Sequence, residues 1–436
     1  MRFLYNLVWP IGLLLFLPRY LVKMFRRGGY RRKFGQRFGI YDAKVRTRLN
    51  SQQTIWLHAV SVGEVAIALK LARAIVAKNP TARFALTTTT TTGFAFAEKN
   101  ALPEIEVMYS PLDFWPITHR AFNAIRPERI ALVEAEVWPN FVAQATGRKI
   151  PLALVNARLS PRSKRRFTRF RPFIAPLFRQ LDIVCVPEPG DVKRWQELGV
   201  VAKRIRHTGS IKFDPGNPVP GRPAPAEASP WRAQSDGSGH DRNPPVLFGG
   251  STHRGEEEIL ARIFLRLRQE FPRLLLFLAP RHVERAGDIK RQMEKLSLGV
   301  GLCSGLPAGK NDQMDCLILD RTGELRRWYE VGSVVFVGKS LTAIGGQNPV
   351  EPIEAGKPVI FGPHMENFAT LARELVANNG AMQINDEASL EQTIRNLLLN
   401  ADWSQGLVAN AQRIVGAHRG ATERTADLLL ALQKAE

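Results

Sequence analysis

Short, continuously apolar segments alternate with helix-length segments along this chain, and this alternation strongly limits the folds open to it. Strands that are apolar along their whole length are buried on both faces, and helices between them give parallel pairing. Helical spacing of Ala, Leu and Ile over Glu64–Lys78 fits such a connection. The pattern predicts a parallel sheet covered by helices on both sides. Its strands in the first half of the chain are Thr54–Val60, Arg83–Thr90, Arg129–Trp138, Pro151–Ala157 and Asp182–Pro187.

A second series of the same kind begins after a break in composition. Residues 215–245 are rich in Pro, Gly, Ser and Ala, which predicts a linker or a disordered insertion. Amphipathic segments after Trp403 predict terminal helices. The strands predicted in the second series are Pro245–Gly250, Leu274–Pro280, Asp315–Asp320, Ser333–Gly338 and Pro358–Pro363.

The 436 residues therefore divide into five parts, two of which are Rossmann-like α/β domains. Open parallel sheets bind ligands at the carboxyl ends of their strands, so two such domains predict a binding cleft between them. The five parts are an N-terminal segment 1–36, a first α/β domain 37–214, the linker 215–245, a second α/β domain 246–403, and C-terminal helices 404–436 that pack back toward the first domain.

The charge of the chain indicates an anionic partner. With 61 Lys and Arg against 40 Asp and Glu, the formal net charge is +21, which fits nucleic acid or an anionic lipid surface. Nine basic residues lie in the first 42 positions, around the apolar segment Phe3–Pro18. That segment is shorter than the ~20 residues of a simple spanning helix. It predicts a membrane anchor or an interfacial helix, and the alternative is a helix packed on the first domain.

A second basic block, Arg158–Phe173, holds seven basic residues and no acid. Its aromatic side chains suit stacking on nucleic acid bases, but the block equally suits anionic lipid headgroups or a phosphorylated substrate. A solvated helix face is the plainest alternative. No nucleic-acid-binding module accompanies the block. Beside a membrane anchor, we therefore expect an anionic membrane surface as the partner and no nucleic acid.

Composition and cysteine spacing exclude other classes of protein. A hydrophobic content of 44% with 23% charged residues excludes a disordered chain and a polytopic membrane protein. The three cysteines, Cys185, Cys303 and Cys316, are too widely spaced for a disulfide scaffold or a cysteine-based zinc site.

Charged residues follow the predicted strands of the first domain. Glu64 stands where a strand passes into a helix, and a carboxylate there can accept a proton from a hydroxyl. The alternative is a helix-capping acid, and we expect the group to stay ionised unless burial intervenes. Glu134 and Glu136 end another strand, although they could simply cap the next helix. Lys212 precedes the linker and suits an anionic leaving group, although solvent-facing lysines are common.

The second domain carries candidate ligand contacts at similar places. Gly249–His253 predicts a glycine-rich turn that can cradle a phosphate. Arg281 ends the next strand and offers a guanidinium to a phosphate or a base. Gly345 and Gly346 precede a helix whose first turn carries Glu351, which suits hydrogen bonds from ribose hydroxyls. The alternative for Glu351 is an ordinary first-turn acid.

Eight motifs in order give the chain a family resemblance. It resembles the bacterial 3-deoxy-D-manno-octulosonic acid (Kdo) transferases, which glycosylate lipid A, over about residues 3–430. The segment 215–245 departs from the family because it is longer than the usual hinge. The motifs are HAVSVGE, TTTTTTG, EAEVWPN, NARLSPRS, TGSIKFD, APRH, RTGEL and GGQNPVEP.

The resemblance implies a GT-B fold, CMP-Kdo as the donor and lipid IVA as the acceptor. It implies that Glu64 is the general base, that Glu134 and Lys212 support the transition state, and that the enzyme works at the cytoplasmic side of the bacterial inner membrane. The positions that match contacts to the CMP moiety are Pro280, Arg281, Thr322, Gly323, Glu324, Asn348, Pro349, Val350 and Glu351.

We expect the reaction to need no cofactor and no metal. A lysine or arginine beside the leaving phosphate, such as Lys212 or Arg281, can offset its developing negative charge. Two other functions compete with this interpretation. One is another nucleotide-sugar enzyme of the same fold, an epimerase or a wall-precursor transferase, and the other is a non-catalytic, membrane-tethered protein that binds anionic lipid.

Overall fold

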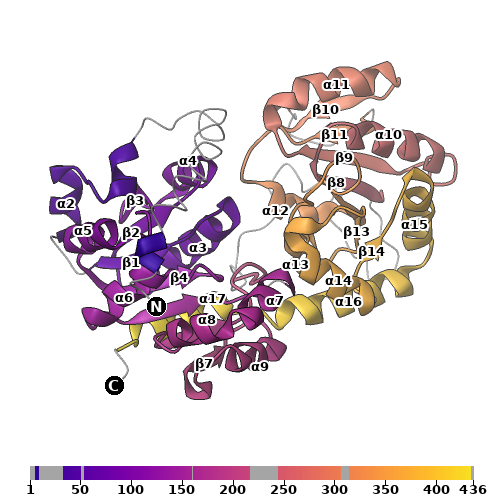
Figure 1. Ribbon diagram of the computed structural model, residues 1–436. Helices are drawn as coiled ribbons and strands as arrows, with labels where there is room; N and C mark the ends of the chain where they lie inside the picture. The colour runs from indigo at the N-terminus through magenta and orange to yellow at the C-terminus, as the bar shows by residue number, and fades with distance from the viewer. Residues whose placement is uncertain are drawn as a thin grey trace. The chain divides into compact units, whose positions relative to one another are not determined.

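The computed structural model describes residues 5–8, 33–50, 54–159, 161–216, 244–305 and 314–433, with the backbone alone at 50, 161, 162 and 164. The chain forms two compact units, Met1–Gly216 with His418–Glu436, and Asn217–Ala417. Figure 1 labels their helices and strands. Most of the predicted anchor 1–36 and of the predicted linker 215–245 lies outside the described residues. Within the described ranges, no helix is both long enough and apolar enough to cross a bilayer.

The first unit is built on a parallel sheet of seven strands in the order β3-β2-β1-β4-β5-β6-β7. Its strands are β1 Thr54–His58, β2 Arg83–Thr88, β3 Ile105–Tyr109, β4 Pro127–Val133, β5 Leu152–Val155, β6 Ile183–Val186 and β7 Ile205–His207. The inner strand β1 pairs with β2 and β4, so that Trp56 lies opposite Ala85 on one side and Ile130 on the other.

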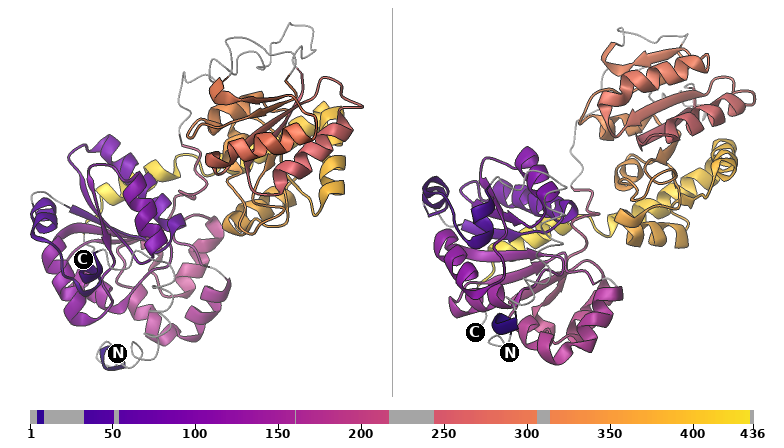
Figure 2. Two further views of the ribbon diagram at one scale, coloured as in Figure 1. Left: turned by 90° about the horizontal axis from the view of Figure 1, so that it is seen from above. Right: turned by 45° about the horizontal axis from the view of Figure 1, so that its top comes forward.

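Helices cover both faces of this sheet, as Figure 2 shows. They are α2 Ala43–Asn50, α3 Val62–Lys78, α4 Thr91–Asn100, α5 Trp115–Ile125, α6 Pro139–Gly147, α7 Pro161–Arg169, α8 Arg171–Phe178, α9 Pro189–Glu197 and α17 Ala421–Leu430. Successive strand residues point to opposite faces. Ile55 and Leu57 therefore join the apolar cluster with α3, α4 and α17, whereas Trp56 packs on Phe122 of α5 and Phe141 of α6.

The second unit repeats this plan with strand order β10-β11-β9-β8-β12-β13-β14, all parallel. Its strands are β8 Val246–Thr252, β9 Leu275–Pro280, β10 Val300–Leu302, β11 Cys316–Ile318, β12 Val334–Val337, β13 Val359–Phe361 and β14 Met382–Gln383. Its helices are α10 Glu256–Leu267, α11 Ala286–Lys295, α12 Leu325–Trp328, α13 Val350–Glu354, α14 Ala369–Ala377, α15 Glu387–Leu399 and α16 Ala401–Gly416. Leu247 faces the cluster with α10, α11 and α15, and Phe248 faces the opposite cluster.

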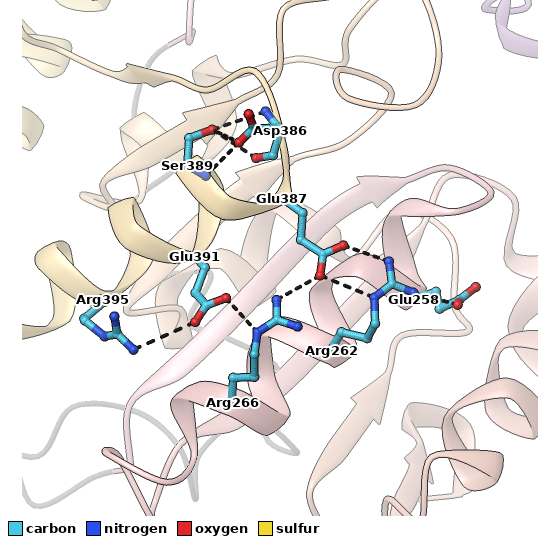
Figure 3. Close-up of polar contacts among 8 residues, drawn as sticks. All are labelled: Glu258, Arg262, Arg266, Asp386, Glu387, Ser389, Glu391 and Arg395. Atoms are coloured by element: carbon cyan, nitrogen blue, oxygen red, sulfur yellow. Dashed lines mark hydrogen bonds and ion pairs between the residues drawn. The ribbon is translucent and has the colours of Figure 1, made fainter.

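Ion pairs join α10 to α15 on the surface of the second unit (Figure 3). Glu387 accepts hydrogen bonds from Arg262 and Arg266, each at 2.8 Å, and Arg266 also reaches Glu391 at 2.7 Å. The Asp386 side chain caps α15. Because exposed pairs contribute only about 0–1 kcal/mol each, the apolar cluster beneath these helices supplies most of their attachment.

Both sheets reverse their strand order at one place. In the first unit the chain builds outward from β1 to β3 and then outward from β4 to β7, so the reversal lies between β1 and β4. In the second unit it lies between β8 and β12. Open α/β sheets bind ligands beyond the carboxyl ends of the strands at this switch point. Residues that directly follow β1, β4, β8 and β12 are therefore the leading candidates for ligand contact.

The structure corrects one predicted turn. Gly249 and Gly250 lie inside β8 and not in the turn that follows it. A Cβ on Gly250 would approach the Tyr329 hydroxyl to 2.4 Å, so glycine is needed here for packing against that ring. The prediction of a turn at these two glycines is therefore wrong.

The remaining predicted features divide between the two units. Of the terminal helices predicted within 404–436, α16 belongs to the second unit and α17 to the first. The three cysteines are buried free thiols, which agrees with the absence of a disulfide scaffold.

Candidate functional site

Glu64 lies in the first turn of α3, directly after β1. The Ser61 side chain caps this helix by accepting the Glu64 N–H at 3.4 Å, and the Ser61 hydroxyl donates to Glu64 Oε1 at 2.8 Å. The Val60 N–H donates to Glu64 Oε2 at 2.9 Å. The carboxylate is thus folded back onto its own turn, and only 8% of the residue is exposed. Glu64 therefore does cap its helix, and the same hydrogen bonds fix its carboxylate at the edge of the sheet.

Burial raises the pKa of Glu64 to about 7. The hydrogen bonds from Val60 and Ser61 oppose this rise, whereas the carboxylates of Glu134 and Glu136 add to it. Burial therefore intervenes, as the sequence-based expectation allowed, and it outweighs the local donors, so that Glu64 is about half ionised near pH 7. A carboxyl group that titrates near neutral pH is well matched to accepting a proton from a hydroxyl.

Glu134 directly follows β4, which ends at Val133. The prediction that this strand continues to Trp138 is therefore wrong. The backbone of Glu134 takes the left-handed conformation with φ 61°, and its N–H donates to the Val155 carbonyl at 3.0 Å. Two residues further on, burial raises the pKa of Glu136, although hydrogen bonding to Trp138 opposes the rise. The two acids therefore lie on a turn at the carboxyl edge of the sheet.

Lys212 lies in the loop after β7, and residues distant in sequence form hydrogen bonds to the backbone of this loop. Asn156, which follows β5, accepts the Ile211 N–H through its side-chain oxygen at 3.0 Å. The Ser210 N–H donates to His418 Nδ1 at 3.2 Å. The motif NARLSPRS begins at Asn156, but nothing in the sequence places residue 418 beside residue 210, so the sequence alone does not identify this anchor.

The C-terminal helix α17 fixes the two ends of the same loop. Asp214 accepts the N–H groups of Gly420 at 3.1 Å and Thr422 at 2.8 Å. Arg424 donates to the Thr208 carbonyl through Nε at 3.0 Å and Nη2 at 2.7 Å. A helix from the end of the chain therefore sets the position of the Lys212 loop.

Glu134 connects the predicted catalytic residues electrostatically. Burial lowers the pKa of Lys212, Glu134 opposes that change, and Arg158 adds to it. Since Glu134 also raises the pKa of Glu64, its carboxylate is close enough to act on both groups. The structure thus brings Glu64, Glu134 and Lys212 to one edge of the first sheet. There, Glu134 helps Lys212 to stay charged.

Glu351 organises the candidate ligand contacts of the second unit. The Asn348 side chain donates to Glu351 Oε1 at 3.3 Å and accepts the Val350 N–H at 3.1 Å. Burial raises the pKa of Glu351, whereas Asn348, Arg326 and Arg281 lower it. Arg281 follows β9 directly, and Arg326, which the sequence did not single out, lies in α12. These side chains gather at the carboxyl edge of the second sheet.

The other predicted contacts occupy turns at this edge. Pro280 ends β9, and Pro349 precedes α13. Thr322 and Gly323 form the turn before α12, where Gly323 has φ 86°, and Glu324 is the N-cap residue of that helix. Glu324 Oε2 is buried and has no hydrogen-bond partner among the described residues. A buried carboxylate oxygen of this kind needs a donor, which a ligand hydroxyl can provide.

The fold and the arrangement of charged side chains define the class of this protein. Two parallel α/β units, each with charged side chains at its switch point, form the organisation of the GT-B glycosyltransferases. The crystal structure of Acinetobacter baumannii MurG has a similar fold, with a TM-score of 0.55 at 14% sequence identity over 87% of this chain and 100% of that chain. At this identity the likeness concerns the fold alone.

Sequence comparison identifies the family within this class. Residues 32–215 match the family model described as 3-deoxy-D-manno-octulosonic-acid transferase (kdotransferase). The 3-deoxy-D-manno-octulosonic acid transferase of Haemophilus influenzae is 32% identical over 405 residues, covering 92% of this chain and 91% of the relative. That of Bordetella pertussis is 32% identical over 413 residues, covering 93% of each. The chain belongs to the 3-deoxy-D-manno-octulosonic acid transferase family and is a glycosyltransferase.

Proposed function

We propose that this enzyme transfers Kdo from CMP-Kdo to lipid IVA during lipopolysaccharide synthesis, with Glu64 as the general base. Family membership supports Kdo as the sugar. The observation that carries the residue assignment is the buried Glu64 carboxyl group, whose pKa is about 7 and which lies at the switch point beside Glu134. The other acids at this edge supply charge near the reacting centre.

The reaction is a direct displacement at the anomeric carbon of the donor. A primary hydroxyl of the acceptor loses its proton to Glu64 as its oxygen bonds to the anomeric carbon, and the bond to the phosphate oxygen breaks, so that CMP leaves and the configuration inverts. Lys212 offsets the negative charge that develops on the leaving phosphate. Glu134 supports the positive charge at the sugar and keeps Lys212 protonated. The proposal includes no metal or cofactor, since these side chains provide the needed charges.

The second unit binds the CMP part of the donor in this proposal. Glu351 accepts hydrogen bonds from ribose hydroxyls, and Asn348 holds its carboxylate in place. The unpartnered Oε2 of Glu324 accepts a further donor from the nucleotide. Arg281 provides a cation beside the phosphate or the base. The turn residues Thr322 and Gly323, with Pro280, Pro349 and Val350, shape the surface around these groups.

The surface of α7 and α8 suits the cytoplasmic face of the inner membrane. Phe170 and Phe173 are 47% and 57% exposed, and Arg165, Arg169 and Arg171 are exposed on the same two helices. Exposed aromatic side chains among arginines fit an anionic lipid surface, where the rings enter the headgroup layer and the guanidinium groups pair with phosphate. Since α7 follows β5, it starts at the carboxyl edge of the sheet that carries Glu64. A lipid acceptor held in the membrane can therefore reach this edge.

The product mass tests the proposal. Protein incubated with freshly generated CMP-Kdo and lipid IVA is expected to add one or more Kdo residues, measured by mass spectrometry.

Glu64→Gln should lower turnover by about 10²–10⁴, the usual contribution of a general base, while CMP binding is unchanged. Lys212→Ala should lower mainly kcat. The exposed Glu197 of α9 provides a matched control, Glu197→Gln, with normal turnover expected. Near-normal turnover by Glu64→Gln contradicts the base assignment, and no product from well-folded protein contradicts the activity.

A further inference from the structure

A buried carboxylate joins the two loops at the switch point of the second unit. Glu256, the first residue of α10, is fully buried. Its Oε2 accepts the N–H groups of His253 and Lys339, each at 2.8 Å. Its Oε1 accepts the N–H groups of Ser340 at 3.0 Å and Leu341 at 3.1 Å. His253 follows β8 and Lys339 follows β12, so one side chain fixes the backbone on both sides of the reversal in strand order.

Glycines bring these loops close together. A Cβ on Gly338 would lie 2.5 Å from the Ser251 carbonyl oxygen and 2.6 Å from Thr252 Cα, so only glycine allows this approach. A Cβ on Gly345 would lie 3.4 Å from both Cε and Nζ of Lys339. The Lys339 side chain therefore extends along the glycine turn of the GGQNPVEP motif and remains at the sheet edge.

Two buried polar atoms at this edge lack a partner. His253 Nε2 and Thr252 Oγ1 are buried and make no hydrogen bond with any described part of the chain. Native proteins pair most such atoms, and an unpaired one calls for an explanation such as a catalytic role or a bound ion. Burial lowers the pKa of His253, and the nearby Lys339, His282 and Arg285 lower it further. These influences favour the neutral imidazole, which has one N–H to donate.

Of the two cations near His253, Arg285 has an acidic partner and Lys339 has none among the described residues. Arg285 is neutralised by a two-point hydrogen bond to the buried Glu257, at 3.0 and 3.2 Å. Lys339 makes no ion pair with any residue in the described ranges, although it is the cation that most lowers the pKa of His253. The edge thus presents an unneutralised ammonium group and an imidazole. This set of donors suits a phosphate group, which offers acceptors only.

We propose that the side chains of His253 and Lys339 bind the phosphate group of the nucleotide-sugar donor, and that Glu256 positions both of them. The inference rests on the proposed function, because it takes a cytidine nucleotide as the ligand. Lys339 supplies the charge and His253 supplies a directed hydrogen bond. Glu256 touches no ligand and acts through the backbone of both residues.

Calorimetric binding of CMP and of cytidine to the full-length protein tests this assignment, since the two ligands differ by the phosphate. Lys339→Met and His253→Ala should each weaken CMP binding by about tenfold or more, the loss expected for one charge-assisted hydrogen bond. Cytidine binding should stay unchanged. His253→Gln, which retains an N–H donor, should lose less than His253→Ala. Glu256→Gln should weaken CMP binding without affecting cytidine, because two of its four backbone donors would then meet an amide NH₂ group.

The control Lys290→Ala removes one positive charge from α11 of the same unit, at an exposed ion pair with Glu294. It should leave both affinities unchanged. Equal losses for CMP and cytidine in the His253 and Lys339 variants would overturn the inference, as would wild-type CMP affinity in both. If the wild-type protein binds no CMP, the proposed donor fails and the inference fails with it. Thermal melting of each variant identifies any loss caused by unfolding, and Lys339→Met tests the site without altering the buried Glu256.

Discussion

The ionisation of Glu64 reflects a balance between opposing influences. Its position at a helix N-terminus and its two hydrogen bonds favour the charged form, each by about 1 kcal/mol. Burial and two neighbouring carboxylates favour the neutral form, and they prevail, since the pKa rises to about 7. A general base is most effective when its pKa lies near the working pH. With Glu64 as the proposed base, the rate of transfer should therefore depend on pH in the neutral range.

The pH profile of kcat/KM should show this ionisation directly. Since the base acts deprotonated, the rate should rise with pH, reach half its plateau near pH 7, and fall to about a tenth one unit lower. Glu136→Gln removes a carboxylate that raises the pKa of Glu64, so the rise should move to lower pH. Glu197→Gln, at the exposed end of α9, should leave the profile in place. An unchanged profile in Glu136→Gln would show that the two acids are not coupled.

The sequence identified the reactive residue types, while their environments came from the fold. Glu64 and Glu134 were recognisable as acids after strands. Burial of Glu64 depends on side chains from other segments, so the local motif alone does not determine its pKa. Lys339 and His253 are far apart in sequence. They become neighbours because β12 lies beside β8, an order that no local pattern encodes.

At the scale of elements, the strands predicted from the sequence are the inner strands of the two sheets. All ten apolar segments form strands, and the four strands that were not predicted, β3, β7, β10 and β14, are the edges of the two sheets. An edge strand pairs on one side only and can be short, as the three residues Ile205–His207 illustrate. Such strands lack the continuous apolar run that identifies a strand buried on both faces.

The exposed aromatic residues of α7 and α8 should assist transfer at a membrane surface. The double variant Phe170→Ser with Phe173→Ser should lower kcat/KM for lipid IVA in anionic vesicles by about tenfold or more, because full burial of such a ring contributes roughly 1.5–3 kcal/mol and the headgroup layer buries each ring in part. CMP binding should be unchanged. The matched control is Leu399→Ser at the end of α15, an equally exposed apolar residue of the second unit. Equal effects of the two changes on kcat/KM would contradict a membrane role for α7 and α8.

At the scale of the whole molecule, the first unit is discontinuous in sequence. The chain completes α16 in the second unit and then supplies α17 to the first. Ala426 and Leu429 of α17 join the apolar cluster with α3. The same helix anchors the loop of Lys212 through Asp214 and Arg424. The last residues of the chain thus complete both the core and the candidate site of the first unit.

Truncation after Ala417 should therefore separate the two ligand-binding functions. The first unit loses the apolar contacts of α17 and every hydrogen bond that Asp214 receives from it, a large share of the ~5–15 kcal/mol that stabilises a typical domain. Transfer to lipid IVA should be lost, and the melting transition of the first unit should move to lower temperature. The second unit keeps all of Asn217–Ala417, so CMP binding measured by calorimetry should remain near the full-length value.

The matched change Asp427→Asn removes only the exposed ion pair of α17 with Lys78 and should preserve both functions. Transfer by the truncated protein at the full-length rate would show that α17 does not position Lys212, and loss of CMP binding would show that the second unit depends on the first.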